Sequence, residues 1–552
     1  MWYITEMEKP AEGKSFFSYF SFITSIATYE QKNPWLYWTW FYFLFVIAAI
    51  VVTLFYVGIG YPFLGFSDTN VNSARLLLSS IIQAEAAIIA IVISLTLVAI
   101  QLVASSYSPR VARIFSSGNQ MYIILLFYVS SIAYCAIILQ ILPGDSGSIG
   151  YLFEYLVSFS LWSSLFLMIA LVPYIKTVLR QVQPEMIISW ECQRISKDTI
   201  ISASPQSNSL DLIFDILHQS IMKYDTGTVK HQLPQISRAV ISVLSEPLTD
   251  DEILQITQDY SQRLTACAQQ SIQLDDLESS RIILENLKDL AICIIALRKD
   301  DSAKQVFDSV HILVKASADK RSWNTLTNIL GVLQECGKNA VDNNLELTTE
   351  RICVCLKQVI QDSIGFINPD DDFGPFYRLA ERSIDIIAAF GYFTIVDNRP
   401  AINDMIVLYL ENIGKYCWNK EHAQFVHTVA DTILDLWLSA VENKVESIRL
   451  PMAAYDAFHS RNRWLERYKF ESEIYEHKIM RIGLHARLHG MNNSVEVAVK
   501  LLAFFRSFDV TSYNENLERF YETLKDEKER AAYQVVFALP AEFAQQDNQG
   551  NT

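Results

Sequence analysis

The chain has 552 residues, of which 51% are hydrophobic and 19% charged, and it carries a formal net charge of -16 at pH 7. Its 18 glycines, 15 prolines and 8 cysteines are too few for a fibrous, low-complexity or disulfide-rich protein, and the apolar content excludes a wholly disordered chain. The negative charge argues against a general nucleic-acid binder.

The charge is distributed unevenly along the chain. Residues 1–180 contain eight Lys or Arg and eight Asp or Glu, so this part has no net charge. Residues 181–552 contain 37 basic and 53 acidic residues and therefore carry the whole -16. The sequence predicts a neutral, apolar N-terminal part and an acidic C-terminal part.

Four apolar segments in the first part are long enough to cross a bilayer, which takes about 20 mostly apolar residues. They cover residues 35–57, 78–104, 121–142 and 151–175. No cleavable signal sequence precedes them, so we expect the first to act as an uncleaved signal anchor. The pattern predicts a four-helix transmembrane domain over residues 35–180. Before it, residues 1–34 form a cytoplasmic segment that is either an interfacial helix or a disordered tail.

Basic residues flank alternate ends of these segments and predict their orientation. They precede the first segment and follow the second and the fourth, at Lys9, Lys14, Lys32, Arg110, Arg113, Lys176 and Arg180. The intervening stretches 58–72 and 143–150 contain neither Lys nor Arg. Because basic flanks are retained in the cytoplasm, we expect a multi-pass protein of the cell membrane with both termini cytoplasmic. Arg110 and Arg113 would then lie at the membrane surface.

The second segment carries a stripe of polar and small side chains. On a helix, seven of them fall within a sector of about 60°: Ser80, Gln83, Ala87, Ala90, Ser94, Gln101 and Ser105. Polar groups in hydrocarbon need partners, so the stripe should face protein or water. Either helices pack tightly there, as the spacing of Ala86, Ala90 and Ser94 favours, or copies of the segment line a polar pathway in an oligomer.

Two carboxylates lie in the apolar segments. Glu85 falls nearly opposite the stripe, about two turns into the second segment, and Glu154 lies near the start of the fourth. An intramembrane carboxylate is costly and indicates a functional site, although a protonated or hydrogen-bonded packing residue is the equal alternative. We expect Tyr134, Ser131 or Ser158 as partner of Glu85. If the fold brings Glu85 and Glu154 together, they form a cation-attracting outer vestibule.

A motif ends the second segment. The residues are Leu-Leu-Ser-Ser at 77–80, Ser-Leu-Thr-Leu-Val-Ala-Ile-Gln-Leu at 94–102 and Ser-Ser-Tyr-Ser-Pro-Arg at 105–110. This pattern resembles an uncharacterised family of predicted prokaryotic integral membrane proteins with a domain of unknown function, and the resemblance runs from the second segment through the fourth. It implies a membrane topology, a prokaryotic origin and a soluble C-terminal part, and it implies no reaction.

Residues 209–538 show successive helix-period apolar patterns with short polar breaks. One stripe consists of Ile283, Leu287, Leu290, Ile294 and Leu297. We expect roughly fourteen helices in a solenoid-like stack or irregular bundle without a strict repeat. The loop at 368–375 is predicted to separate two helical cytoplasmic lobes, 181–368 and 369–545, before a disordered tail at 546–552. The predicted fold class is therefore all-α throughout.

Motifs for chemistry are missing from the sequence. There is no glycine-rich phosphate loop and no nucleophile motif. His485 and His489 have the spacing of zinc ligands but no accompanying acid, and Cys353 and Cys355 are predicted to be buried thiols. The acidic run at 370–372 lacks the spacing of a calcium loop. We therefore expect no enzymatic activity, no cofactor and no metal site.

Two functions fit these features. The first is an oligomeric channel or transport-type protein, with the second segment at the pathway and the helical domain as regulator. The second is a membrane-anchored scaffold or sensor whose acidic helical domain binds a cytoplasmic protein partner. The expected partners are thus the lipid bilayer, further copies of the chain in a homo-oligomer, and a cytoplasmic protein, with no nucleic acid.

Overall fold

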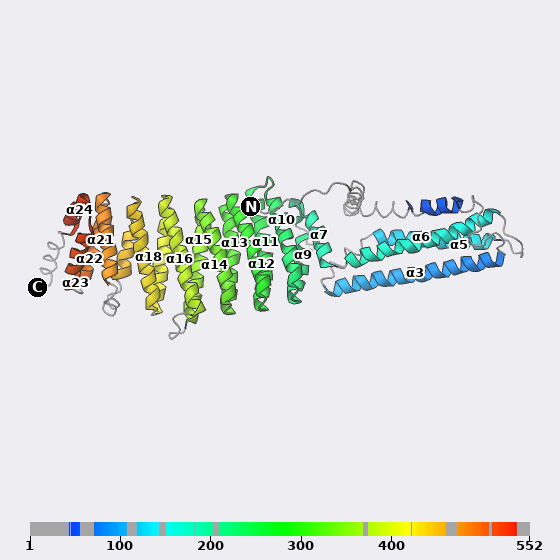
Figure 1. Cartoon of the computed structure of the whole chain (residues 1–552), viewed down its shortest axis with the longest axis horizontal. Coiled ribbons are helices and arrows are strands. Elements are labelled where there is room, and N and C mark those ends of the chain that lie inside the picture. The colour runs from blue at the N-terminus through cyan, green and yellow to red at the C-terminus, as the bar shows by residue number, and fades with distance from the viewer. Residues whose placement is uncertain are drawn as a thin grey trace, which may run out of the picture. The chain divides into compact units, whose positions relative to one another are not determined.

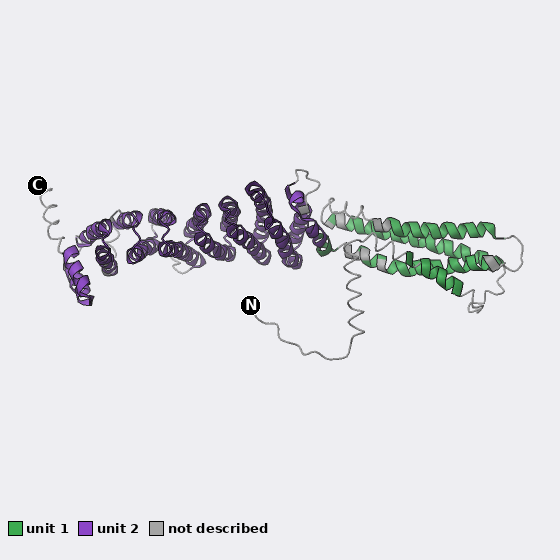
Figure 2. Ribbon diagram, turned by 90° about the horizontal axis from the view of Figure 1, so that it is seen from above, with its two compact units in different colours: residues 1–187 green, residues 188–552 purple. Residues whose placement is uncertain are grey.

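The computed structural model describes residues 43–44, 46–55, 71–106, 119–142, 151–181, 183–201, 209–367, 374–420, 422–459, 472–506 and 510–537. The chain divides into two compact units, Met1–Ile187 and Ile188–Thr552 (Figure 2). All regular elements of the described residues are helices. The all-α prediction is confirmed for this part of the chain.

The first unit contains three long helices that pack against one another (Figure 1). They are α3 (Val71–Ser106), α5 (Asn119–Ile141) and α6 (Tyr151–Gln181). Two apolar clusters join them. One includes Leu78, Ile81, Cys135 and Ile138, and the other includes Val92, Ile124, Tyr128 and Leu167. Along α3, the two clusters lie on either side of Glu85.

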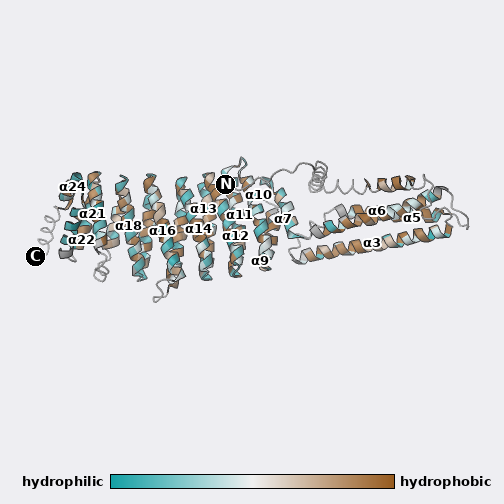
Figure 3. Cartoon of the chain, viewed as in Figure 1, coloured by the Kyte–Doolittle hydropathy of each residue, from teal (hydrophilic) through white to brown (hydrophobic). Residues whose placement is uncertain are grey.

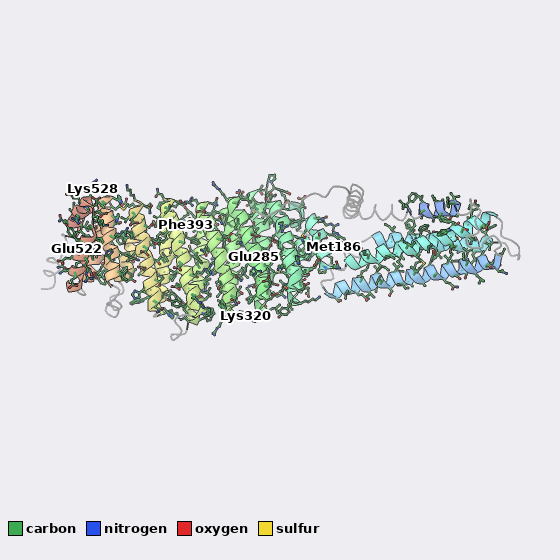
Figure 4. The ribbon with its side chains drawn as sticks, viewed as in Figure 1. Met186, Glu285, Lys320, Phe393, Glu522 and Lys528 are labelled. Atoms are coloured by element: carbon green, nitrogen blue, oxygen red, sulfur yellow. The ribbon has the colours of Figure 1, made fainter. Side chains whose placement is uncertain are left out.

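The outward sides of these helices are also apolar, as the hydropathy colouring in Figure 3 shows. Leu76, Leu126 and Val172 are 71%, 65% and 68% exposed. Leaving such surface in water costs about 25 cal/mol per Å² relative to an apolar surrounding. A surface of this kind is typical of helices that lie in lipid.

Three helical segments are long and apolar enough to cross a membrane: Val71–Leu102, Tyr122–Ile141 and Phe153–Lys176. They correspond to the second, third and fourth predicted segments. Of the first predicted segment, 35–57, the structure describes the shorter apolar helix Val46–Phe55. Ten residues of helix span about 15 Å, half of the roughly 30 Å hydrocarbon core. The described residues thus contain three candidate spans and not the four predicted, and residues 1–42 of the predicted N-terminal segment and anchor lie outside them.

The second unit consists of amphipathic helices. It begins within α7 (Pro184–Arg194) and α8 (Lys197–Ile201). The helices that follow are α9 (Ser209–Met222), α10 (Thr226–Leu244), α11 (Asp250–Gln273), α12 (Leu277–Ala296), α13 (Asp300–Asp319), α14 (Trp323–Asp342), α15 (Glu346–Phe366), α16 (Pro375–Val396), α17 (Pro400–Asn419), α18 (Ala423–Glu442), α19 (Arg449–His459), α21 (Ser472–Leu488), α22 (Asn492–Arg506), α23 (Val510–Thr523) and α24 (Glu527–Phe537). These are fifteen helices among the described residues from 209 onward, against the roughly fourteen predicted.

These helices are stacked as pairs in two layers. From α9 to α18, nearly every helix packs against its neighbour in sequence, and each packs against the helix two further on. The odd-numbered helices α9 to α19 therefore form one layer and the even-numbered helices α10 to α18 form the other, and Figure 2 shows the two rows of helices. Each helix buries its apolar stripe between the layers and leaves a polar side outside.

A regular interval, which the sequence analysis did not detect, governs this stack. Four consecutive helices begin at Leu277, Asp300, Trp323 and Glu346, each 23 residues after the last, and the same interval separates Pro400 from Ala423. The expectation that no strict repeat exists is thus wrong for helix length. The interval is set by a helix of about 20 residues followed by a three-residue turn.

The turns share one backbone geometry built on different residues. Asp275, Arg298, Arg321 and Asn344 all have φ between 53° and 58°, the left-handed conformation. At the second of these turns, Arg298 N–H donates to Ile295 O (2.9 Å) and the next amide to Ile294 O (3.3 Å). This pair of bonds is the Schellman motif, which usually contains glycine. The repeat is therefore in the backbone and not in residue identity.

Polar contacts also connect one helical pair to the next. The carboxylate of Asp300, at the start of α13, accepts hydrogen bonds from the backbone amides of Leu347 (3.0 Å) and Thr348 (2.9 Å) of α15. Asp300 thereby caps the helix two positions further on. The predicted lobes 181–368 and 369–545 are not separate: α15 packs against both α16 and α17 across the intervening loop.

Candidate functional site

The candidate site lies on α3, whose opposite sides differ in environment. The four polar stripe residues Ser80, Gln83, Ser94 and Gln101 are all exposed. Glu85, nearly opposite them, is fully buried at 0% exposure. The helical-wheel prediction that these groups lie on opposite sides is thus consistent with the observed burial. The helices α5 and α6 pack on the Glu85 side.

The exposed stripe has little hydrogen bonding of its own. The Ser80 hydroxyl donates to the carbonyl oxygen of Leu76 in the preceding turn (2.8 Å). Gln83, Ser94 and Gln101 make no side-chain hydrogen bond to any residue that the structure describes. Tight packing of this stripe against another helix of the same chain, one of the two predicted alternatives, is not observed among the described helices. Both amide groups are left available to a partner.

The buried carboxyl group of Glu85 is held by α5. The Ser131 hydroxyl donates to Glu85 Oε1 at 2.8 Å, so one of the three expected partners is confirmed. The hydroxyl of Ser164 on α6 also interacts with the carboxyl group. Oε2 has no hydrogen bond of normal geometry within the described part of the chain. Tyr134, another expected partner, instead donates to the carbonyl oxygen of Leu156 (3.3 Å).

Glu85 lies deeper than the sequence suggested, and it is not beside Glu154. It is the fifteenth of the 32 residues of Val71–Leu102, close to the middle of that span. Glu154 is in the first turn of α6, ten residues before Ser164, which is level with Glu85. Ten residues of helix correspond to about 15 Å. The structure therefore does not bring the two carboxylates together into one vestibule.

Two further hydrogen bonds, which the sequence analysis missed, fix α3 and α5 against α6. The hydroxyls of Thr96 and Tyr174 are 2.9 Å apart, and Tyr128 Oη donates to the carbonyl oxygen of Leu167 at 3.0 Å. A tyrosine or threonine that falls on the buried side of an apolar helix is the signal for such a bond. Arg110 and Arg113, predicted at the membrane surface, lie outside the described residues.

The second unit contains a cluster of charged groups between α13 and α15. Arg351 Nε lies 2.5 Å from Asp308 Oδ1, and Arg351 Nη2 lies 3.2 Å from His311 Nδ1. Burial, followed by the positive charge of Arg351, lowers the pKa of His311 below its usual value. A histidine in this state is neutral in the folded protein at neutral pH.

Other predicted chemical groups are placed as follows. The rings of His485 and His489 have centroids 6.5 Å apart, and no group of three or more His, Cys, Asp or Glu suited to a metal occurs within the described ranges. Cys353 and Cys355 are fully buried, and burial raises the pKa of both thiols, that of Cys355 to about 12. Such thiols are unreactive at neutral pH. The acidic run 370–372 lies outside the described residues.

Together these features define the class of protein: an all-α membrane protein in which apolar helices precede a large unit of paired amphipathic helices. Residues 31–231 match the model of a family described as "Predicted membrane protein (DUF2254)". The match confirms the resemblance to an uncharacterised membrane-protein family. It reaches from before the first predicted segment into α10, further along the chain than the resemblance seen in the sequence.

Other comparisons add little. None of the curated proteins compared matches the chain. The chain is similar to a solved structure described as "Circular tandem repeat protein with novel repeat topology and enhanced subunit contact surfaces", with 11% identity and a TM-score of 0.36, covering 67% of this chain and 99% of the other. A TM-score this low does not define a shared fold.

Proposed function

We propose that this protein is an oligomeric channel or transport protein of the cell membrane in which α3 of one copy faces α3 of another. The observation that carries the proposal is the exposed stripe of Ser80, Gln83, Ser94 and Gln101 within an apolar span. In hydrocarbon, amide and hydroxyl groups without partners cost free energy. Each of these groups both donates and accepts hydrogen bonds, so the stripe is complementary to itself. Copies arranged around an axis would enclose an uncharged polar pathway.

The topology and the second unit complete the proposal. Residues 35–57 form the first of four spans, with both termini in the cytoplasm of a prokaryotic cell. The second unit is a cytoplasmic α-solenoid that regulates the membrane part, and the chain has no catalytic activity or cofactor of its own. The paired, evenly spaced helices from α9 to α18 support the solenoid.

Disulfide cross-linking in membranes tests whether copies of α3 meet along the stripe. Ser94→Cys places a thiol on the stripe, and Ile93→Cys places one about 100° away on an equally exposed part of the same helix. We expect an oxidant to convert the Ser94→Cys protein to a covalent dimer and to leave the Ile93→Cys protein monomeric. Equal cross-linking of both variants, or of neither, contradicts the proposed interface.

Solute flux tests whether the interface encloses a pathway. Purified protein in liposomes should pass small ions or neutral solutes, and Gln83→Leu combined with Gln101→Leu should reduce that flux because the polar lining is lost. Ile93→Leu, outside the stripe, is the matched control and should behave as the unaltered protein. A stable monomer in detergent, without flux under any condition, would overturn the channel proposal.

The second candidate function, a membrane-anchored scaffold or sensor, is favoured by the charge of one helical layer. The helices α9, α11, α13 and α15 contain thirteen Asp or Glu and five Lys or Arg, a net charge of -8. The helices α10, α12, α14 and α16 of the other layer contain seven of each. A layer with this imbalance attracts a basic protein surface.

Charge reversal in each layer tests the scaffold. A basic partner should co-purify with the full chain, be lost on deletion of residues 200–552, and be weakened by Asp251→Lys with Asp301→Lys. The matched reversal Glu381→Lys with Asp385→Lys, on the other layer, should retain it. If both pairs of substitutions act alike, the acidic layer is not the binding surface.

A further inference from the structure

The environment of Glu85 leads to an inference that is separate from the proposed pathway, because Glu85 faces away from the stripe. Its carboxyl group has 0% exposure and lies between two apolar clusters of the α3, α5 and α6 bundle. Oε1 accepts the hydrogen bond from Ser131, and Oε2 has no partner of normal geometry among the described residues. One oxygen of a fully buried acid is thus unaccounted for.

The helices around Glu85 supply no positive charge to balance a carboxylate. The groups of α5 that interact with it electrostatically are the phenol of Tyr128 and the thiol of Cys135. From α6, the hydroxyl of Ser164 faces it. The nearest basic residue in the described sequence of α3 is Arg75, about 15 Å along the helix, and its guanidinium donates to the carbonyl oxygen of Leu142. An ionised carboxylate left unpaired in such a place costs several kcal/mol.

The geometry also distinguishes a proton from a metal ion. Hard cations such as Mg²⁺ and Ca²⁺ take about six or more oxygen ligands. Glu85 has around it only the hydroxyls of Ser131 and Ser164, and Ser131 is already at hydrogen-bond distance from Oε1. A proton needs one oxygen on each side and no added volume. It also removes the charge that the surrounding bundle does not balance.

We propose that Glu85 is a proton-binding site within the membrane. In the loaded state Oε2 carries the proton and shares it with the Ser164 hydroxyl, while Ser131 donates to Oε1. Loss of the proton leaves a negative charge between the two apolar clusters and weakens the packing of α3 against α5 and α6. The bound proton therefore holds the three helices together.

Infrared spectroscopy of the full chain in liposomes at pH 7 tests this directly. The spectrum of the unaltered protein minus that of Glu85→Gln should contain the C=O stretch of a neutral carboxylic acid. Ser131→Ala keeps the acid but removes its hydrogen bond, so the same band should remain and move to higher frequency. Glu154→Gln, at the outer end of α6, is the matched control, and its difference spectrum should contain carboxylate bands only.

Three results would overturn the proposal: a Glu85 difference spectrum with only carboxylate bands, an acid band that does not respond to Ser131→Ala, or an acid band that disappears when Na⁺ is added at constant pH. The last result would identify an alkali-ion site in place of a proton site. Helix content by circular dichroism and a single peak in size exclusion establish that each variant is folded. The readout does not depend on contacts between copies of α3, so it can fail or succeed independently of the proposed pathway.

Discussion

Gly337 on α14 lets the ring of Phe390 on α16 pack directly on the helix backbone. A Cβ atom added at residue 337 would lie 2.6 Å from Cε2 and 2.9 Å from Cε1 of Phe390, which is 1% exposed. Ordinary carbon contacts are about 3.5–4.0 Å. Gly337→Ala therefore requires either a strained Phe390 rotamer or a wider separation of α14 and α16.

The expected magnitude follows from two opposing terms. Overpacking of a core costs about 1–3 kcal/mol, and replacing glycine by alanine within a helix gains about 1 kcal/mol. The net result for Gly337→Ala is a loss of about 1 kcal/mol. Gly331 lies on the same helix and has no atom within 4 Å of an added Cβ, so Gly331→Ala keeps only the gain. The two variants should differ by about 2 kcal/mol, with opposite signs.

Thermal unfolding of the purified full chain, followed by circular dichroism, measures this difference. In a unit of this size 1 kcal/mol corresponds to a change in Tm of about 2 °C. Gly337→Ala should lower Tm and Gly331→Ala should raise it. If both substitutions raise Tm by the same amount, the close approach of Phe390 to the α14 backbone is refuted.

The same assay tests three other features of the second unit. Asp300→Ala removes the cap of α15 and should lower stability by about 1–2 kcal/mol; Asp301→Ala deletes the same charge one residue further on and should have a much smaller effect, and equal losses would contradict the cap. Arg298→Gly should raise stability by roughly 0.5–1 kcal/mol, because a left-handed conformation costs a non-glycine residue about 1–2 kcal/mol and part of that gain is offset by the entropy of glycine; Arg298→Ala should bring no gain. Because the pKa of His311 is lowered in the folded protein, the unfolded chain binds a proton first, so the contribution of His311 to stability is complete above about pH 6.5 and is lost as the pH falls below that value. His311→Gln should make Tm less dependent on pH in that range, and an unchanged profile would show that this histidine does not contribute.

The membrane part was largely predictable, because lipid imposes strong rules on sequence. Three of the four predicted spans correspond to candidate spans in the structure. The helical wheel placed Glu85 opposite the stripe and Ser131 among its partners. It did not reveal the depth of Glu85, since α3 begins at Val71, before the apolar segment predicted from hydropathy. A wheel gives angles around an axis, whereas depth depends on where the helix starts.

The 23-residue interval of the second unit was not predicted, for a physical reason. Repeats are usually found from recurring residue types, and turns with positive φ are usually found from glycine. Here Asp275, Arg298, Arg321 and Asn344 occupy equivalent turns. Their shared property is a backbone conformation that side chains of any type can adopt at a modest cost. Only the spacing of the apolar stripes carries the repeat in the sequence, and that signal varies at every position.

The two proposals concern opposite sides of one rigid helix, and this makes them separable. Glu85 and Ser94 are nine residues apart and face different surroundings, one buried against α5 and the other exposed. Glu85→Gln keeps a neutral side chain of the same size, so it should leave cross-linking through Ser94→Cys unchanged. If it abolishes that cross-linking in a folded protein, no direct contact explains the effect. The effect must then pass through movement of α3 as a body, since a helix transmits a shift of one side to the other.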